Sequence, residues 1–262
     1  MRDVHDPAIK AIEQACKDAS LSYERHFHRH DNFGQLTFGA SLGSGQVEPG
    51  ELVNGVINAA ILTSLLSNIT FIRLAGFATG LFANWAPNLY DMYVQYMSVF
   101  YKKYTKLRRP FLNGIFSVCT FNLGLRTCAL GHRDFLNLAF GWCAITALGE
   151  FDYKRGGHPI LWDAKLILEF PPGCTILIPS AALYHSNIPI GMNETRYSFT
   201  QYTAGGLFRW VEQGFMTEGE YWAMLDAKGR EEEKALGLER AEVGAGMFST
   251  LKELKTTAAE GA

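Results

Sequence analysis

The chain has 262 residues, of which 48% are hydrophobic and 13% aromatic, enough to bury one large core or two small ones. The formal net charge of −2 excludes a uniformly basic protein, so contact with nucleic acid would need a local basic patch. The five cysteines include no C-x-x-C pair and match neither a zinc cluster nor a disulfide framework. We therefore expect a protein of a reducing compartment.

The sequence offers no targeting or membrane signal. The first ten residues, MRDVHDPAIK, lack the basic-then-apolar plan of a signal peptide. The most apolar windows, 52–66 and 110–124, are too short or too polar to span a bilayer. We expect a soluble intracellular monomer without a membrane partner. We also expect a single domain over residues 1–262, because no linker-like run separates its halves.

Residues 1–109 are predicted to be mainly helical support. Asp6 and Pro7 suit the N-cap and first turn of the first helix. Apolar residues recur three and four positions apart, which is the spacing of an amphipathic helix. The helices expected on this ground cover residues 7–20, 49–68, 70–84 (helical or partly extended) and 88–106.

The stretch 22–50 is rich in Gly, His and Ser and is expected to be a loop. His26, His28 and His30 could together bind a metal or a phosphate from a strand, or simply form a solvated face. Gly43-Ser-Gly45 is too sparse for a nucleotide-binding loop.

The composition changes at Pro110. Short segments rich in β-branched and aromatic residues are separated there by Gly, Pro and Asn, which predicts strands able to form two facing sheets over 110–215. Residues 216–262 are predicted to form a helix over 217–240 and a frayed tail. The fold class expected is α+β. The expected strands are 111–120, 125–130, 135–148, 159–170, 174–179 and 196–203.

Gly131-His132-Arg133-Asp134 carries the strongest chemical signal. On a strand, His132 and Asp134 would lie on the same face. His185, fifty-one residues after Asp134, would add an imidazole from another strand. Two histidines and one carboxylate bind a non-haem Fe(II) and leave positions open for a co-substrate and O₂. The alternative for a short H-x-D motif is a turn with a surface histidine.

Arg196 and Ser198 share one face of a predicted strand. A guanidinium can bind a carboxylate through two parallel hydrogen bonds, and a serine hydroxyl can add another. We expect these two residues to bind the distal carboxylate of 2-oxoglutarate. The alternative for Arg196 is a salt bridge with Glu194.

Five cations crowd the end of the helix predicted at 88–106. Cations at this end are favourable because of the helix dipole alone, so a phosphate-binding patch is the secondary interpretation. The five are Lys102, Lys103, Lys106, Arg108 and Arg109.

In these motifs and in the sequence around them, residues 70–215 resemble the catalytic core of TET/JBP-type dioxygenases, and in particular the fungal TET-like branch. The resemblance implies a double-stranded β-helix (jelly-roll) core, with Fe(II) and 2-oxoglutarate as cofactors. It also implies a nuclear enzyme that oxidises 5-methylcytosine in DNA to 5-hydroxymethyl-, 5-formyl- and 5-carboxylcytosine. By position, the resemblance assigns the iron to His132, Asp134 and His185, and the co-substrate to Arg196 and Ser198.

The resemblance also implies contacts with a base flipped out of duplex DNA. Asn137 falls where the family places a polar group touching the base, and Tyr202 where an aromatic ring stacks on it. From the residues alone, Asn137 could instead be a loop amide that satisfies the backbone, and Tyr202 a core aromatic.

One departure from the family widens the expected substrate range. Eight residues after Arg196, better-known members carry a histidine that bonds the cytosine edge, whereas this chain has Ala204. The loss of this hydrogen-bond donor should weaken discrimination between methylated bases. N6-methyladenine therefore becomes a second expected substrate, and its oxidation would remove the methyl group. Asp163 is a further acidic group expected to face the pocket.

Two other functions stay open at this point. The first is a 2-oxoglutarate oxygenase that acts on RNA, protein or a small molecule, for which binding would lack the steep salt dependence expected with DNA. The second is an inactive nucleic-acid-binding relative, although the presence of all five site residues argues against it.

Overall fold

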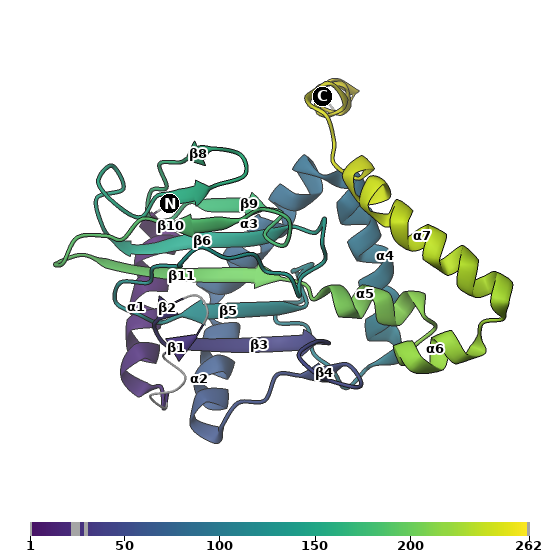
Figure 1. Ribbon diagram of the computed structural model, residues 1–262. Helices are drawn as coiled ribbons and strands as arrows, with labels where there is room; N and C mark the ends of the chain where they lie inside the picture. Colours follow the sequence, from purple (N-terminus) through teal and green to yellow (C-terminus); the bar gives the residue numbers. More distant parts are fainter. Residues whose placement is uncertain (1, 22–26, 29–30, 261–262) are drawn as a thin grey trace.

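The structure of the protein, a computed structural model, describes residues 2–21, 27–28 and 31–260. This part of the chain combines helices with antiparallel β-sheets (Figure 1). The helices are α1 (Arg2–Asp18), α2 (Val56–Ser67), α3 (Ile69–Trp85), α4 (Pro87–Lys103), α5 (Gly205–Glu212), α6 (Glu218–Met224), α7 (Ala227–Gly246) and α8 (Leu251–Glu260). The strands are β1 (Phe27–His28), β2 (Asp31–Asn32), β3 (Gln35–Ser41), β4 (Gly50–Glu51), β5 (Val118–Asn122), β6 (Cys143–Glu150), β7 (Pro159–Leu161), β8 (Leu166–Ile167), β9 (Thr175–Ile178), β10 (His185–Asn187) and β11 (Thr195–Tyr202).

The main sheet has six strands in the order β4-β3-β5-β11-β6-β9. Its central strand, β11, pairs with β5 on one side and β6 on the other, so that Ser198 lies opposite both Asn122 and Ala147. Residues of a strand alternate between the two faces of a sheet. The odd-numbered residues Tyr197 and Phe199 therefore face away from the even-numbered Arg196 and Ser198.

One face of the main sheet is covered by α1, α2 and α3 (Figure 1). Phe199 packs there against Phe121, with ring centroids 5.0 Å apart, and against Phe71 of α3 at 5.2 Å. Each fully buried aromatic ring of this kind contributes about 1.5–3 kcal/mol of burial free energy. This apolar layer fixes the sheet, and through it the side chains of the opposite face.

A second, three-stranded sheet, β10-β7-β8, lies opposite the other face of the main sheet, since residues of β7 and β10 line the same cavity as residues of β5, β6 and β11. Two facing sheets agree with the expectation from the sequence. The polar side chains that line the cavity come from the strand face turned away from the helices.

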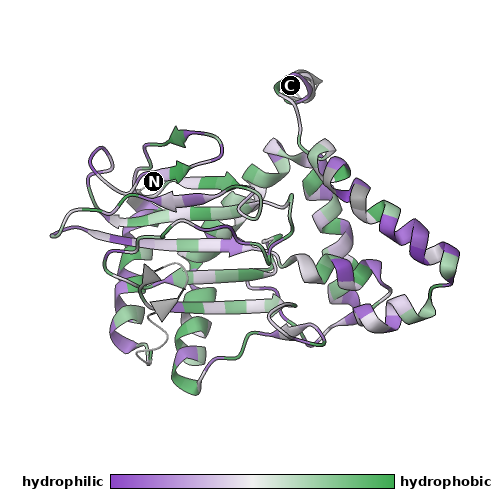
Figure 2. Ribbon diagram, viewed as in Figure 1, coloured by the Kyte–Doolittle hydropathy of each residue, from purple (hydrophilic) through white to green (hydrophobic). Residues whose placement is uncertain are grey.

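The C-terminal helices extend the molecule away from the sheets, and hydrophilic residues run along much of α7 (Figure 2). Arg240 of α7 lies 3.9 Å from Glu212 of α5 and also pairs with Glu233 within its own helix. Residues 230–234 of this helix are exposed except for Glu233. The expected frayed tail instead contains α8.

The N-terminal region differs from expectation in two places. The first helix begins at Arg2, so Asp6 is not its N-cap and Pro7 lies inside it. The helix extends further because Val4 packs against the same core as Ala8 and Ile12, at intervals of four residues. The predicted start of the second helix at Pro49 is also wrong, because α2 begins at Val56.

Residues 22–50, expected to be a loop, supply β3, an inner strand of the main sheet. Leu36 and Phe38 of this strand enter the helical core, while Gln35 and Ser41 line the cavity. Gly39 interrupts the pattern with a φ of +134°, at a place where a Cβ would overlap the Ser117 carbonyl. A glycine is therefore required at this position, and it interrupts the alternation by which the sequence would show a strand. The motif of His26, His28 and His30 lies outside the part of the chain whose side chains are described.

Several expected strands are shorter than predicted. β5 begins at Val118 and β6 at Cys143, while 125–130 and 135–142 are irregular apart from single bridges at Arg126 and Asn137. The short helix α5 was not expected, because it opens with two glycines.

Within the described ranges, no single helix is long and apolar enough to cross a membrane, although α2 and α3 pass that test as a pair bent by 66°.

Candidate metal centre

A cavity of about 310 Å³ lies between the two sheets. This volume falls near the lower end of the roughly 300–1,000 Å³ found for small-molecule sites. Along β11 the cavity is lined at every second residue, by Arg196, Ser198, Thr200 and Tyr202, and then by Ala204. The predicted site residues on this strand therefore share one wall.

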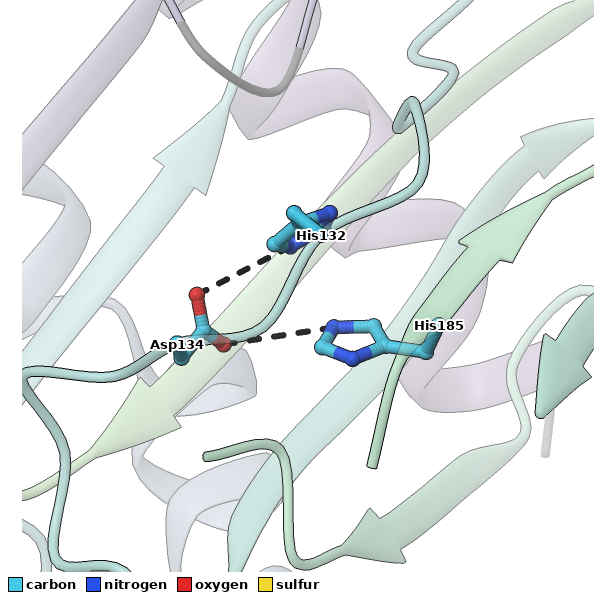
Figure 3. A group of neighbouring side chains, drawn as sticks. All are labelled: His132, Asp134 and His185. Atoms are coloured by element: carbon cyan, nitrogen blue, oxygen red, sulfur yellow. Dashed lines mark ion pairs between the residues drawn. The ribbon is translucent and has the colours of Figure 1, made fainter. Parts of the chain in front are cut away.

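His132, Asp134 and His185 meet in this cavity (Figure 3). Nε2 of His132 lies 3.7 Å from one Asp134 carboxylate oxygen, and Nε2 of His185 lies 4.0 Å from the other. One potential ligand atom from each residue lies within 4.8 Å of the other two. Two imidazoles and one carboxylate in this arrangement fit a metal site that leaves coordination positions open.

His185 opens β10, whereas His132 and Asp134 are held by backbone pairing outside any regular strand. His132 and His185 exchange N–H···O bonds of 3.0 and 2.9 Å in a single antiparallel bridge. Asp134 follows in coil, where its N–H donates to the Ser180 carbonyl at 3.0 Å. His132 and Asp134 still turn inward while Arg133 between them is exposed, so the expected same-face arrangement forms without the expected strand.

Both imidazoles are oriented by main-chain carbonyls. Nδ1 of His132 lies 2.6 Å from the Leu130 carbonyl, and Nδ1 of His185 lies 2.8 Å from that of Leu183. A carbonyl only accepts, so in the neutral imidazole the proton resides on Nδ1. Nε2 then carries the lone pair, on the side of each ring that faces Asp134. A metal ligand requires this tautomer.

Arg196 is buried, with 4% of its surface exposed, and it lines the cavity. Its Nη1 donates to the Thr127 carbonyl at 2.8 Å, while its Nε is buried without a hydrogen-bond partner. Burial lowers the pKa of Arg196 to about 10. No carboxylate in the described ranges forms an ion pair with it, although buried charges are normally paired. The cavity thus holds a cation suited to an anionic ligand.

The alternative role of Arg196, a salt bridge with Glu194, does not form. Oε1 of Glu194 accepts from the Asp152 N–H at 2.8 Å, and Oε2 accepts from the Gly191 N–H at 2.6 Å. Both oxygens stabilise the loops around the start of β11 instead. Glu194 therefore does not neutralise the cation inside the cavity.

Ser198 lies one step along the same face of β11 and is 4% exposed. Its Oγ accepts from Nδ2 of Asn122 at 2.8 Å, so its own proton stays available for an acceptor in the cavity. Ser198 and Arg196 are placed together, as the sequence suggested. Their co-substrate role stays a prediction.

The two predicted base contacts lie at the other end of β11. Asn137 lines the cavity and pairs with Ala204 through a single bridge. Tyr202 also lines the cavity, where burial raises its pKa to about 12 although a hydrogen bond with Thr120 opposes the shift. The phenol is therefore neutral at physiological pH. The structure places both residues as expected, and their contact with a base stays a prediction.

Asp163 lies elsewhere than expected. It is not among the residues that line the cavity, and its carboxylate accepts from the Tyr184 N–H at 2.6 Å and from Arg133 at 3.0 Å. The Tyr184 hydrogen bond, aided by Arg133, lowers the pKa of Asp163 below its ordinary value. The acidic group thus links the two segments that carry His132 and His185 instead of facing a substrate.

Sequence reasoning missed two further positions. Ser180 accepts from the Asp134 N–H through its carbonyl and from Asn137 through its side chain. Gly131 permits the close approach of Tyr184, whose hydroxyl a Cβ would meet. The glycine directly before His132 was visible in the sequence. Nothing local marks Ser180, since Asp134 and Asn137 both lie more than forty residues before it.

The basic residues after α4 are partly engaged within the protein. Arg108 pairs with Glu51 at 2.7 Å, and the guanidinium of Arg109 lies 4.7 Å from the centroid of the Tyr101 ring. Lys102 and Lys106 are exposed. The cluster can contribute a few phosphate contacts rather than an extended basic surface.

No protein-family profile matches the chain, and no curated protein matches its sequence. Among solved structures it is similar to NgTET1 in complex with 5mC DNA, with 14% sequence identity and a TM-score of 0.49, over 77% of this chain and 69% of that chain.

Proposed function

We propose that the protein is an Fe(II)- and 2-oxoglutarate-dependent dioxygenase. The observation that carries this proposal is the presence in one cavity of a two-histidine, one-carboxylate group and a buried guanidinium without a carboxylate partner in the described ranges. A structural role would explain either feature alone. Both together are what a metal and an anionic keto-acid require.

The residues present fit both groups. His132, Asp134 and His185 would hold the iron through Nε2, a carboxylate oxygen and Nε2, because carbonyls already occupy both Nδ1 atoms. Arg196 and Ser198 would hold the distal carboxylate of 2-oxoglutarate. When bound, iron and 2-oxoglutarate supply the oxidation of a C–H bond by O₂, coupled to decarboxylation of the keto-acid.

The rest of the cavity wall determines how enclosed the reaction is. Ile145, Phe170 and Ile176 line the cavity with apolar side chains. Such a wall excludes water from the reacting groups and strengthens the interaction of Arg196 with an anion. We interpret the two facing sheets that enclose it as a double-stranded β-helix forming one catalytic domain.

For the substrate, we propose a methylated base flipped out of duplex DNA. Asn137 and Tyr202 stand at the end of the cavity away from Arg196 and offer one amide and one ring, which together suit a planar base. The resemblance of the motifs to TET/JBP-type enzymes supports 5-methylcytosine, oxidised stepwise to the hydroxymethyl, formyl and carboxyl forms, in the nucleus. Ala204 leaves space beside them for N6-methyladenine.

The modest number of exposed cations favours keeping a second candidate, an oxygenase of RNA, protein or a small molecule. A DNA substrate predicts an affinity that falls steeply between low and physiological salt, because released counterions drive binding to phosphate. A salt-insensitive KM would favour the second candidate.

The proposal is tested by mass spectrometry of methylated duplex DNA after incubation with the protein, Fe(II), 2-oxoglutarate and O₂. We expect oxidised bases to appear with the wild type and the His5→Ala variant, whose histidine lies on α1, but not with His132→Ala. Products at equal levels with His132→Ala, or no product with iron-loaded wild type on any methylated base, would reject it.

A further inference from the structure

Ser180 lies behind the cavity wall, two residues after β9, and is 1% exposed. Its carbonyl accepts from the Asp134 N–H at 3.0 Å, and its Oγ lies 3.2 Å from Nδ2 of Asn137. One buried residue therefore contacts both a predicted metal ligand and a predicted base contact. The way its hydroxyl is bonded decides which atom of the Asn137 amide faces the cavity.

A serine hydroxyl has one proton to donate and lone pairs that accept. The Ser180 side chain is hydrogen-bonded to the thiol of Cys143, whose Sγ lies 4.0 Å from the Ala144 carbonyl oxygen, an acceptor for the thiol's own proton. Burial raises the pKa of Cys143 well above its ordinary value, so the thiol is neutral. The Ser180 proton is thus directed at Cys143 Sγ, and Ser180 Oγ can only accept from Asn137.

The Asn137 amide is thereby fixed in one orientation. Its NH₂ group is turned toward Ser180, and its carbonyl oxygen Oδ1 is left without a hydrogen-bond partner in the described ranges. This Oδ1 is not among the buried side-chain atoms that lack a hydrogen-bond partner, and Asn137 lines the cavity. The site thus presents a hydrogen-bond acceptor to whatever base enters it.

We infer that Ser180, acting through Asn137, makes the site select bases that carry an exocyclic N–H. This inference rests on the proposed function and names its substrate class. 5-Methylcytosine offers N4–H₂ and N6-methyladenine keeps one N6–H, so both can donate to Oδ1. Thymine carries the same 5-methyl group but places the acceptor O4 at that edge, so two acceptors would face each other without a proton.

Matched duplexes that differ only in 5-methylcytosine or thymine at one position test the inference. Products are quantified by mass spectrometry with Fe(II) and 2-oxoglutarate, as 5-hydroxymethylcytosine and 5-hydroxymethyluracil. A site built to accept a hydrogen bond rejects an analogue that lacks the donor, so we expect the wild type to prefer 5-methylcytosine at least about tenfold in kcat/KM. A wild type that oxidises both equally would overturn the inference and leave the proposed function intact.

Ser180→Ala removes the acceptor that holds the amide, so Asn137 can turn Nδ2 toward thymine O4. We expect the preference for 5-methylcytosine to fall at least about fivefold, since one neutral hydrogen bond is at stake. Ser117→Ala is the matched control, because Ser117 is equally buried and its hydroxyl has no partner in the described ranges. This control should keep the wild-type preference.

Cys143→Ala provides an independent variant should Ser180→Ala not fold. Without the sulfur, the Ser180 proton is free to turn to Asn137 Oδ1, which would direct Nδ2 into the cavity and relax the preference in the same way. An unchanged preference in whichever of the two variants folds would overturn the inference. A wild type that oxidises neither duplex would overturn the proposed function, and the inference with it.

Discussion

Arg133 and Asp163 form an ion pair on the outer side of the metal-ligand segments, with Nη2 of Arg133 3.1 and 3.0 Å from the two carboxylate oxygens. Nε of Arg133 also donates to the Ala182 carbonyl at 2.9 Å, and Asp163 accepts from the Tyr184 N–H. The pair therefore joins the residue between His132 and Asp134 to the residue before His185. Its partners lie outside the cavity, so it acts on the ligands through the backbone.

Asp163→Ala should weaken metal binding more than it weakens the fold. Groups that orient metal ligands typically change affinity by about 10–100-fold, whereas a half-exposed ion pair contributes about 0–1 kcal/mol to stability. We expect Mn²⁺ affinity, measured by calorimetry on the metal-free protein, to fall about tenfold with a small change in Tm. Glu232→Gln, which removes an exposed ion pair on α7, is the control. Equal metal affinity in Asp163→Ala and the wild type would contradict this role.

Arg196→Lys should convert a pH-insensitive anion site into one that titrates. Burial brings the pKa of Arg196 to about 10, so the guanidinium is charged at pH 7–9 and loses its proton only above that range. A lysine starts lower, from about 10.4, and the same burial would lower its pKa further. The protonated form binds the anion, so affinity is full below the folded pKa and declines above it. We expect 2-oxoglutarate affinity to be flat from pH 6.5 to 9 in the wild type and to fall across this range in Arg196→Lys. Parallel profiles would show that Arg196 does not bind the anion.

Ala204→Leu should narrow the substrate range. Ala204 is buried and lines the cavity beside Asn137, so a larger side chain would occupy space available to a purine. Filling a cavity of fixed shape typically costs about 1–3 kcal/mol. We expect oxidation of N6-methyladenine to fall at least about tenfold relative to 5-methylcytosine, measured on duplexes carrying each base. An equal loss on both bases would mean that this space does not separate them.

Phe199→Ala should lower stability without removing the metal ligands. Phe199 is fully buried between Phe71 and Phe121, on the face of β11 opposite the cavity. Truncating a buried phenylalanine costs about 3–5 kcal/mol. Urea denaturation should show this loss, while Leu112→Ala, which changes a residue that is 97% exposed, should stay within about 0.5 kcal/mol. A loss below about 1 kcal/mol for Phe199→Ala would contradict the assigned core.

The sequence allowed the grouping of the candidate ligands to be predicted because their spacing has a local meaning. Arg196 and Ser198 share one face of a strand that formed as expected. His132 and Asp134 also point to the same side, although the chain there is irregular. Such pairs need only the backbone to be extended. The third ligand, His185, depended on the match to the motif and was not predictable from spacing alone.

The features that could not be predicted depend on contacts between distant segments. Asp163 is held outside the cavity by Arg133, thirty residues before it. β3 contains Gly39, whose positive φ breaks the alternation expected of a strand, so the sequence of this stretch resembles a loop. Ser180 contacts Asn137 across forty-three positions, and no local pattern marks a serine for that role.

A metal held by His132, Asp134 and His185 and an anion held by Arg196 are expected to share one cavity. Calorimetric titration of 2-oxoglutarate into the Mn²⁺-loaded protein, without O₂ or DNA, tests it directly. We expect one 2-oxoglutarate site per chain in the wild type and no metal-dependent binding of 2-oxoglutarate in His132→Ala. In Arg196→Met, 2-oxoglutarate should bind about 2–4 kcal/mol more weakly. Folding of Arg196→Met should be unimpaired, because the substitution removes an unpaired buried charge. If 2-oxoglutarate binds to the metal-free protein and to Arg196→Met as strongly as to the Mn²⁺-loaded wild type, the metal and the anion do not share the proposed site.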